Sequence, residues 1–207
     1  MNKSLFEEII RVFHASDVLE DSLGTRVDKH LVLIRRKAAE EEARSILSRK
    51  WGTWSISDLS RVIELINCNG FGDANTRFSN LFLKNRSQVE KVGVDRTRDT
   101  LVCLLDTKSD LGDRIRGAQS IYGSSSQGMF SSLLYVLDPF AYSPRFRPIV
   151  ASLHRYGFVE GSPLKTTMAD YGRYCRIMNG LEEEYSIPPQ LTDYLLTTWT
   201  GVWGKFR

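Results

Sequence analysis

The sequence has few of the residues on which several common classes of site depend. It has three cysteines in 207 residues, Cys68, Cys103 and Cys175, and no two of them form a CxxC pair. This spacing argues against a zinc ribbon and against a thioredoxin-like redox site. The apolar neighbours of each cysteine predict three buried free thiols, which is typical of proteins in a reducing cytoplasm.

Long apolar runs are also missing. No stretch approaches the roughly 20 consecutive apolar residues that a membrane-spanning helix requires. The first residues, MNKSLFEEIIRVFHASD, place Glu7 and Glu8 inside an apolar run and contain no signal-peptide cleavage pattern. We therefore predict a cytoplasmic protein with no membrane partner.

The short motifs of common enzymes are missing as well. The three histidines, His14, His30 and His154, stand in no metal-ligating spacing such as HExxH. The Gly/Ser-rich segment 123–128 has neither the GK[ST] of a phosphate-binding loop nor the GxSxG of a serine hydrolase. We therefore predict no cofactor and no catalytic residues, and an enzyme with unrecognised motifs is the least favoured class of function.

Helical patterning is what the sequence does contain. Apolar residues recur at helical spacing along most of the chain, and no alternating run exceeds a few residues. We predict an all-α fold, a single compact multi-helical domain of about nine or ten helices over residues 1–207. Residues 1–50 are either an integral part of it or a helical hairpin packed on a core formed by residues 51–207.

One long helix is predicted over residues 26–49. Its charge run, Arg35-Arg36-Lys37 followed by Glu40-Glu41-Glu42, is predicted to be a solvated face with i,i+4 pairs such as Arg36–Glu40. Its apolar, inward face is predicted to consist of Val27, Leu31, Ile34, Ala38 and Ile46.

The segment INCNGFGD, residues 66–73, is a first candidate for phosphate binding. Its two glycines permit positive φ angles and a close approach of another backbone. N–H groups at the start of a following helix can then bind a DNA phosphate. In this interpretation Gly70, Gly72 and Arg77 contact DNA, and the alternative is an ordinary turn between two helices.

A second candidate lies in the middle of the chain, where basic charge is concentrated. Residues 77–98 and residues 139–176 each hold six basic residues against two acidic ones. Basic and aromatic residues together suit phosphate contact and base stacking. A helix is predicted to carry Arg147, Ser152 and Arg155 on one side. The predicted nucleic-acid-binding residues of this segment are Arg145, Arg147, His154 and Arg155.

Gly128 and the segment SSLLYVLDPFAYSP, residues 131–144, resemble part of the helical accessory domains of bacterial restriction and defence proteins, and the resemblance covers roughly residues 109–158. More distantly, residues 109–158 resemble the scaffold of the helix-hairpin-helix DNA glycosylases, and residues 66–73 resemble their hairpin. The resemblance implies a helical scaffold and DNA contact. A glycosylase site would need an aspartate after Tyr142, where this sequence reads Ser143-Pro144-Arg145-Phe146-Arg147, so the resemblance does not imply base excision.

Two classes of function remain. The first is a non-catalytic DNA-associated helical module of a restriction, defence or repair system, which contacts the phosphate backbone and has another protein subunit as a second kind of partner. The alternative is a protein–protein interaction or regulatory module with an exposed apolar patch. The residues predicted to form that patch are Trp51, Trp54, Tyr142, Trp199 and Trp203.

Overall fold

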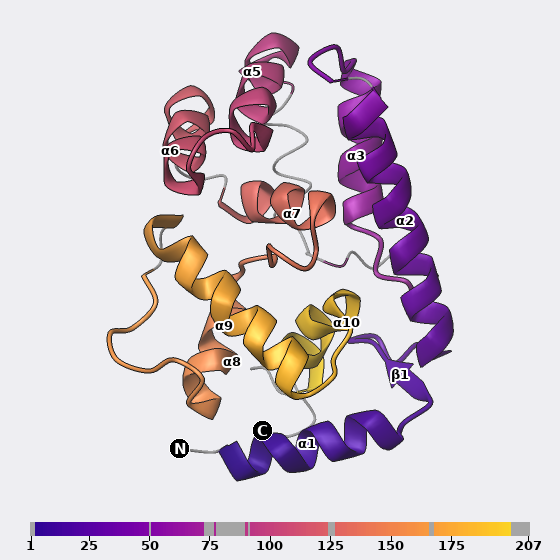
Figure 1. The fold of residues 1–207 in the computed structure, drawn as a ribbon. Helices are drawn as coiled ribbons and strands as arrows, with labels where there is room; N and C mark the ends of the chain where they lie inside the picture. The colour runs from indigo at the N-terminus through magenta and orange to yellow at the C-terminus, as the bar shows by residue number, and fades with distance from the viewer. Residues whose placement is uncertain are drawn as a thin grey trace.

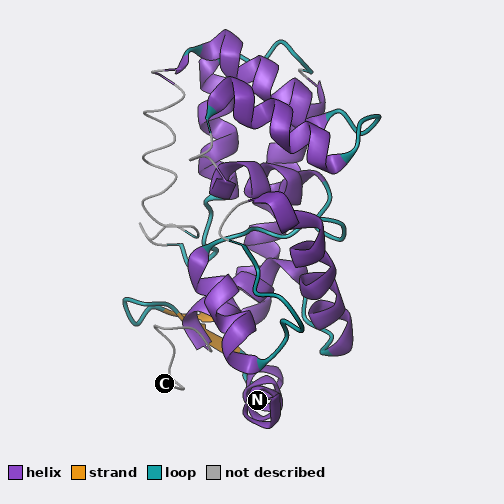
Figure 2. Ribbon diagram, turned by 90° about the vertical axis from the view of Figure 1, so that its left-hand side faces the viewer, coloured by secondary structure: helices purple, strands orange, loops and turns teal. Residues whose placement is uncertain are grey.

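The computed structural model describes residues 3–49, 51–72, 77, 90, 92–123, 127–165 and 168–199. Within these residues the chain forms nine α-helices, a 3-10 helix (η2), a π-helical turn (η3) and one two-stranded hairpin (Figures 1 and 2). The predicted all-α class and helix number are therefore confirmed. In chain order the elements are α1 (Lys3–Ala15), β1 (Val18–Glu20), β2 (Arg26–Asp28), α2 (Lys29–Arg49), α3 (Ile56–Ile66), α5 (Val94–Leu105), α6 (Leu111–Tyr122), α7 (Gln127–Leu137), α8 (Arg147–Tyr156), η2 (Met168–Asp170), α9 (Tyr171–Glu184), α10 (Pro189–Tyr194) and η3 (Leu195–Trp199).

The hairpin was not predicted. Strands β1 and β2 pair in antiparallel register, with Leu19 opposite Val27. The turn between them is closed by Asp21, whose Oδ1 accepts hydrogen bonds from the backbone N–H groups of Leu23 and Thr25. Because residues 26–28 belong to this hairpin, the helix predicted to begin at residue 26 begins at Lys29.

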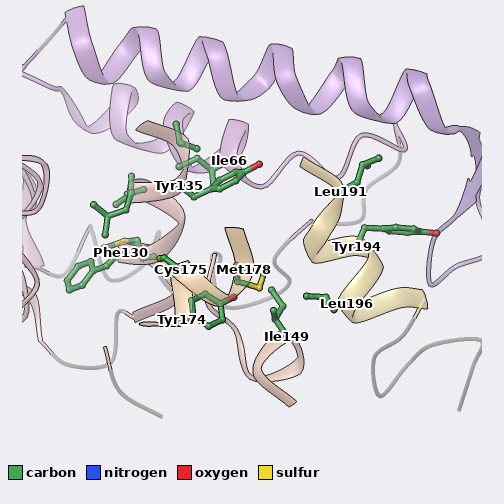
Figure 3. Close-up of a cluster of buried hydrophobic side chains, with 14 of the residues drawn as sticks. Ile66, Phe130, Tyr135, Ile149, Tyr174, Cys175, Met178, Leu191, Tyr194 and Leu196 are labelled. Atoms are coloured by element: carbon green, nitrogen blue, oxygen red, sulfur yellow. The ribbon is translucent and has the colours of Figure 1, made fainter. Parts of the chain in front are cut away.

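The helices surround one buried apolar core. Helix α2 runs along one edge of the molecule beside α3, the pair α5 and α6 lies at one end, and α1 lies at the other (Figure 1). The core extends from Phe6 in α1 to Trp199 in η3. Below α2, side chains from α3, α7, α8, α9, α10 and η3 meet (Figure 3). Those labelled there are Ile66, Phe130, Tyr135, Ile149, Tyr174, Cys175, Met178, Leu191, Tyr194 and Leu196.

The inward face of α2 differs from the predicted one. Leu31 and Ile34 were predicted to be buried, but they are 39% and 49% exposed. The prediction failed because it treated charged residues as solvated, whereas Arg36 and Glu40 lie on the inner face and have partners there. The buried residues of α2 are Val32, Arg36, Ala39, Glu40, Ala43 and Leu47.

Other boundaries follow the local signals more closely. The sequence allows either Ser55 or Ser57 to cap α3. Ser55 is the cap, and its side chain and that of Asp58 form a capping box. The sequence predicts a helix near residues 164–179; α9 begins at Tyr171, directly after η2. The sequence also predicts helical segments at residues 77–85 and near 88–92, and most of these positions lie outside the described residues. Among the described helices, none has the length and apolar character needed to cross a membrane.

Glu182 of α9 is a buried carboxyl group without a cation beside it. It is 9% exposed and makes no ion pair in the part of the chain that the structure describes. Burial raises the pKa of Glu182 to about 7; a hydrogen bond from Thr192 opposes this shift and the neighbouring charge of Asp193 adds to it. The folded protein therefore holds this proton more tightly than the unfolded chain does.

We predict that Glu182→Gln removes a pH dependence of stability. Since the folded pKa lies above the ordinary value of 4.5, the wild-type protein loses stability as the pH rises from about 4.5 to about 7. The variant should match the wild type near pH 4.5 and exceed it at pH 8 by an amount on the order of 3 kcal/mol. Urea unfolding across this pH range measures the difference. Glu183→Gln, at the exposed neighbouring position, is the control, and equal pH dependence of both variants would contradict the assignment.

Candidate nucleic-acid interface and a buried charge cluster

The glycine loop that precedes Arg77 packs against α2. Gly70 and Gly72 have φ angles of 83° and 86°, as expected for positions that need glycine. A Cβ atom on Gly70 would lie 2.8 Å from the carbonyl oxygen of Val32 in α2. Close approach of the two backbones is therefore a sufficient reason for glycine at this position.

The polar groups of this loop are bound from within the molecule. The carbonyl oxygen of Gly70 accepts a hydrogen bond from Arg35 (3.1 Å), and that of Asn69 accepts one from Arg36 (2.7 Å). The N–H group of Phe71 donates to the side chain of Asn69. The loop thus anchors α2, and its close approach to Val32 accounts for Gly70 without a phosphate.

Arg77 points into the protein, which corrects its predicted role in phosphate contact. Its side chain is 1% exposed; Nη1 lies 2.6 Å from Glu40 Oε1, and Nη2 lies 2.9 Å from Asp193 Oδ1. The same guanidinium donates to the hydroxyl of Tyr135 and to the carbonyl of Gln190. Desolvation opposes its charge, but Asp193, Tyr135 and Glu40 raise the pKa of Arg77 well above the usual value. A DNA backbone cannot reach a guanidinium enclosed in this way.

Arg77 belongs to a larger buried charge cluster, which we define as Arg36, Glu40, Arg77, Tyr135, Gln190 and Asp193. Arg36 Nη1 lies 3.1 Å from Asp193 Oδ1, so one carboxylate serves two guanidinium groups. The carboxylate of Glu40 accepts from Tyr135 and Gln190 in addition to Arg77. The cluster therefore joins α2, α7 and α10 to one another and to Arg77.

The charges of the cluster balance one another. Two guanidinium groups face two carboxylates, and although desolvation raises the pKa of Asp193, Arg77 and Arg36 hold it below its usual value. Desolvation lowers the pKa of Arg36. A pocket of about 70 Å³ borders the cluster, far smaller than the roughly 300 Å³ at which ligand pockets begin. It is lined by Asp21, Ser22, Arg36, Asn69, Phe71, Arg77, Asp193, Tyr194, Thr197 and Thr198.

Arg145 is also internal, which corrects the second predicted contact with DNA. It is 6% exposed, and its Nη1 lies 2.7 Å from Asp170 Oδ1 in η2. Its Nη2 donates to the carbonyl of Lys165, and its guanidinium lies 5.2 Å from the centre of the Tyr174 ring. Arg145 therefore ties the turn between α7 and α8 to the segment that leads into α9.

Helix α8 brings the remaining predicted residues together on its outer face. Arg147, His154 and Arg155 are all exposed and stand at positions i, i+7 and i+8. The opposite face is buried and includes Ser152, whose hydroxyl donates to the carbonyl of Leu196. The prediction that Ser152 shares a side with the two arginines is therefore wrong. Three of the seven predicted binding residues form one basic surface, which we call the α8 face.

The predicted aromatic patch does not form as expected. Trp54 and Trp199 are 0% and 6% exposed, and the indole N–H of Trp54 donates to the carbonyl of Leu47. Trp51 is 47% exposed, Tyr142 is half-buried, and Trp203 lies outside the described residues. Two of the five aromatic side chains therefore stabilise the core.

The buried pairing of Arg36, Glu40 and Asp193 was not predicted from the sequence. Their spacing could have indicated that Arg36 and Glu40 are buried, because they follow Val32 at intervals of four residues and share its face of the helix. A hydrophobicity pattern assigns such residues to solvent, because it does not include a partner that lies far away in the sequence.

We predict that Arg77→Met is strongly destabilising. Removing the guanidinium leaves the buried carboxylate of Glu40 without a cation and removes one of the two that Asp193 binds, which should cost about 3–5 kcal/mol of unfolding free energy. Arg147→Met, an equal change on the α8 face, should cost less than about 0.5 kcal/mol. Urea unfolding followed by circular dichroism compares the two, and similar losses would contradict the role given to the cluster.

Comparison with known proteins identifies no relative. No family model matches the chain, and no curated protein or solved structure matches it at a significant level.

Proposed function

We propose that the protein is a non-catalytic DNA-associated helical module that contacts the phosphate backbone through the α8 face. One observation carries the proposal: Arg147, His154 and Arg155 are exposed together on a single side of one helix. Basic side chains that neutralise phosphates supply most of the sequence-independent affinity for DNA.

The charges of the α8 face differ from the internal arginines in having no acidic partner. Arg77 and Arg145 are neutralised by carboxylates, whereas Arg147, His154 and Arg155 pair with no acidic residue that the structure describes. Arg155 lies over the ring of Tyr156, 5.6 Å from its centre. The contact orients this guanidinium and leaves its charge available to a phosphate.

The spacing of the three side chains suits a phosphate backbone. Seven to eight residues correspond to about 11 Å along a helix, which is the rise of about three phosphates on one DNA strand. Arg147 is the first residue of α8, where the positive end of the helix dipole also favours an anion. The two ends of the α8 face are therefore suited to separate phosphates of one strand.

The buried charge cluster favours binding over catalysis, because it offers neither a free charged group nor room for a substrate. Its charged groups are paired with one another, and the pocket beside it, about 70 Å³, is too small for a nucleotide. A role in restriction, defence or repair is supported by the resemblance of residues 109–158, and another protein subunit would supply any chemistry.

The test is fluorescence anisotropy with a labelled DNA duplex. At about 50 mM salt the wild-type protein should bind, and its affinity should fall steeply as salt is added. Arg147→Glu/Arg155→Glu should weaken binding at least tenfold for every sequence tested and should lower the salt slope by about two.

The matched control is Arg61→Glu/Arg116→Glu. It changes the net charge equally, at exposed arginines of α3 and α6. This variant should bind nearly as well as the wild type. Equal weakening of both double variants, or no binding by the wild type at low salt, would refute the proposal.

A further inference from the structure

Helix α2 runs along one edge of the molecule (Figure 1). Its outer face exposes large apolar side chains. Leu31 is 39% exposed and Ile34 is 49% exposed, and Ala38 continues the same exposed stripe. Positions i, i+3 and i+7 lie on one side of a helix. We define these three residues with their exposed charged neighbours on the helix as the α2 face.

The charges of the α2 face have opposite signs in its two halves. Nearer the N-terminus, Arg35 and Lys37 are exposed; nearer the C-terminus, Glu41 and Glu42 are exposed. Arg35 and Glu42 lie on one flank of the stripe, because they are seven residues apart. Lys37 and Glu41 lie on the other flank, because they are four residues apart. Each flank therefore carries one positive and one negative charge.

We infer that the α2 face is a self-association surface, on which two copies of the chain pack antiparallel around a two-fold axis near Ala38. A two-fold interface is self-complementary, so a surface with basic and acidic halves fits a second copy of itself when the copies run in opposite directions. A parallel arrangement would place like charges together. The inference does not depend on DNA binding.

The register follows from the positions of the charges. An axis between residues 38 and 39 puts Arg35 level with Glu42 of the second copy. Along the helix axis, the same symmetry axis leaves an offset of only about 1.5 Å between Lys37 and Glu41 of the second copy. Both flanks then pair opposite charges, and the symmetry doubles each pair. One register thus satisfies all four charged positions.

The Lys37–Glu41 pairs are the main charge contacts in this arrangement. Glu42 already accepts two hydrogen bonds from Arg61, and Arg35 donates to the carbonyl of Gly70. Lys37 and Glu41, in contrast, make no ion pair with the residues that the structure describes. Their charges are therefore available to the second copy.

The apolar stripe supplies the contact between the two flanks. In the same register Leu31 and Ile34 reach the small side chain of Ser45 and the aliphatic stem of Glu42 in the second copy. Ala38 meets its own symmetry mate, and its small side chain allows the two helices to approach closely. With two large apolar side chains on each copy, the dimer is weak and depends on concentration.

The test is sedimentation of the full chain, without nucleic acid, from micromolar to millimolar concentration. The wild type should form a dimer as concentration rises. Lys37→Glu and Glu41→Lys should each weaken dimerisation about tenfold, because each replaces two attractive pairs with two repulsive ones. Lys108→Glu, an equal charge reversal in the exposed α5–α6 connection, should dimerise like the wild type.

Mixing the two α2 variants gives the decisive result. Antiparallel packing places position 37 of each copy beside position 41 of the other. Lys37→Glu makes both positions acidic and Glu41→Lys makes both basic, so only the mixed pair brings opposite charges together. An equimolar mixture should therefore form a heterodimer as tight as the wild-type dimer.

Thermal unfolding of each α2 variant verifies that it is folded, so that a loss of dimer is not a loss of structure. A monomeric wild type at all concentrations, or a mixture as weak as its components, would overturn the inference.

Discussion

The fold depends on one carboxylate that binds two buried guanidinium groups. Asp193 of α10 lies 3.1 Å from Arg36 and 2.9 Å from Arg77, and Glu40 completes the charge balance. Charges can be buried only when they are paired and hydrogen-bonded, so these groups allow one arrangement of the segments that carry them. They join the N-terminal part of the chain to its last described helix, and α7 to both through Tyr135.

The cluster also determines which surfaces remain for function. Because Arg36 and Glu40 turn inward, Leu31 and Ile34 turn outward, which gives α2 an apolar stripe between charged flanks. Arg145 is likewise taken inward by Asp170, so that Arg147 and Arg155 are the exposed members of the four arginines predicted to contact DNA. The two proposed surfaces, one for DNA and one for a second copy, are therefore both consequences of interior pairing.

Local signals predicted much of the helical framework. Ser55 caps α3 as its sequence context indicated, and α7 ends before Asp138, whose carboxylate accepts the N–H group of Phe140 in the turn. The predictions were wrong where a contact between residues far apart in the sequence determines the local structure. Residues 26–28 pair with residues 18–20 as a strand and do not belong to the helix that follows. The buried face of α2 also differs from the face that the hydrophobicity pattern indicates.

The sequence by itself determined the all-α class and the helical spacing of Arg147, His154 and Arg155. These properties depend on backbone conformation and on neighbours within two turns. Only the tertiary structure decided that Arg77 and Arg145 are internal. The carboxylate of Asp193 is 116 residues from Arg77, and the free energy of burying a charge depends on such a partner and not on local spacing.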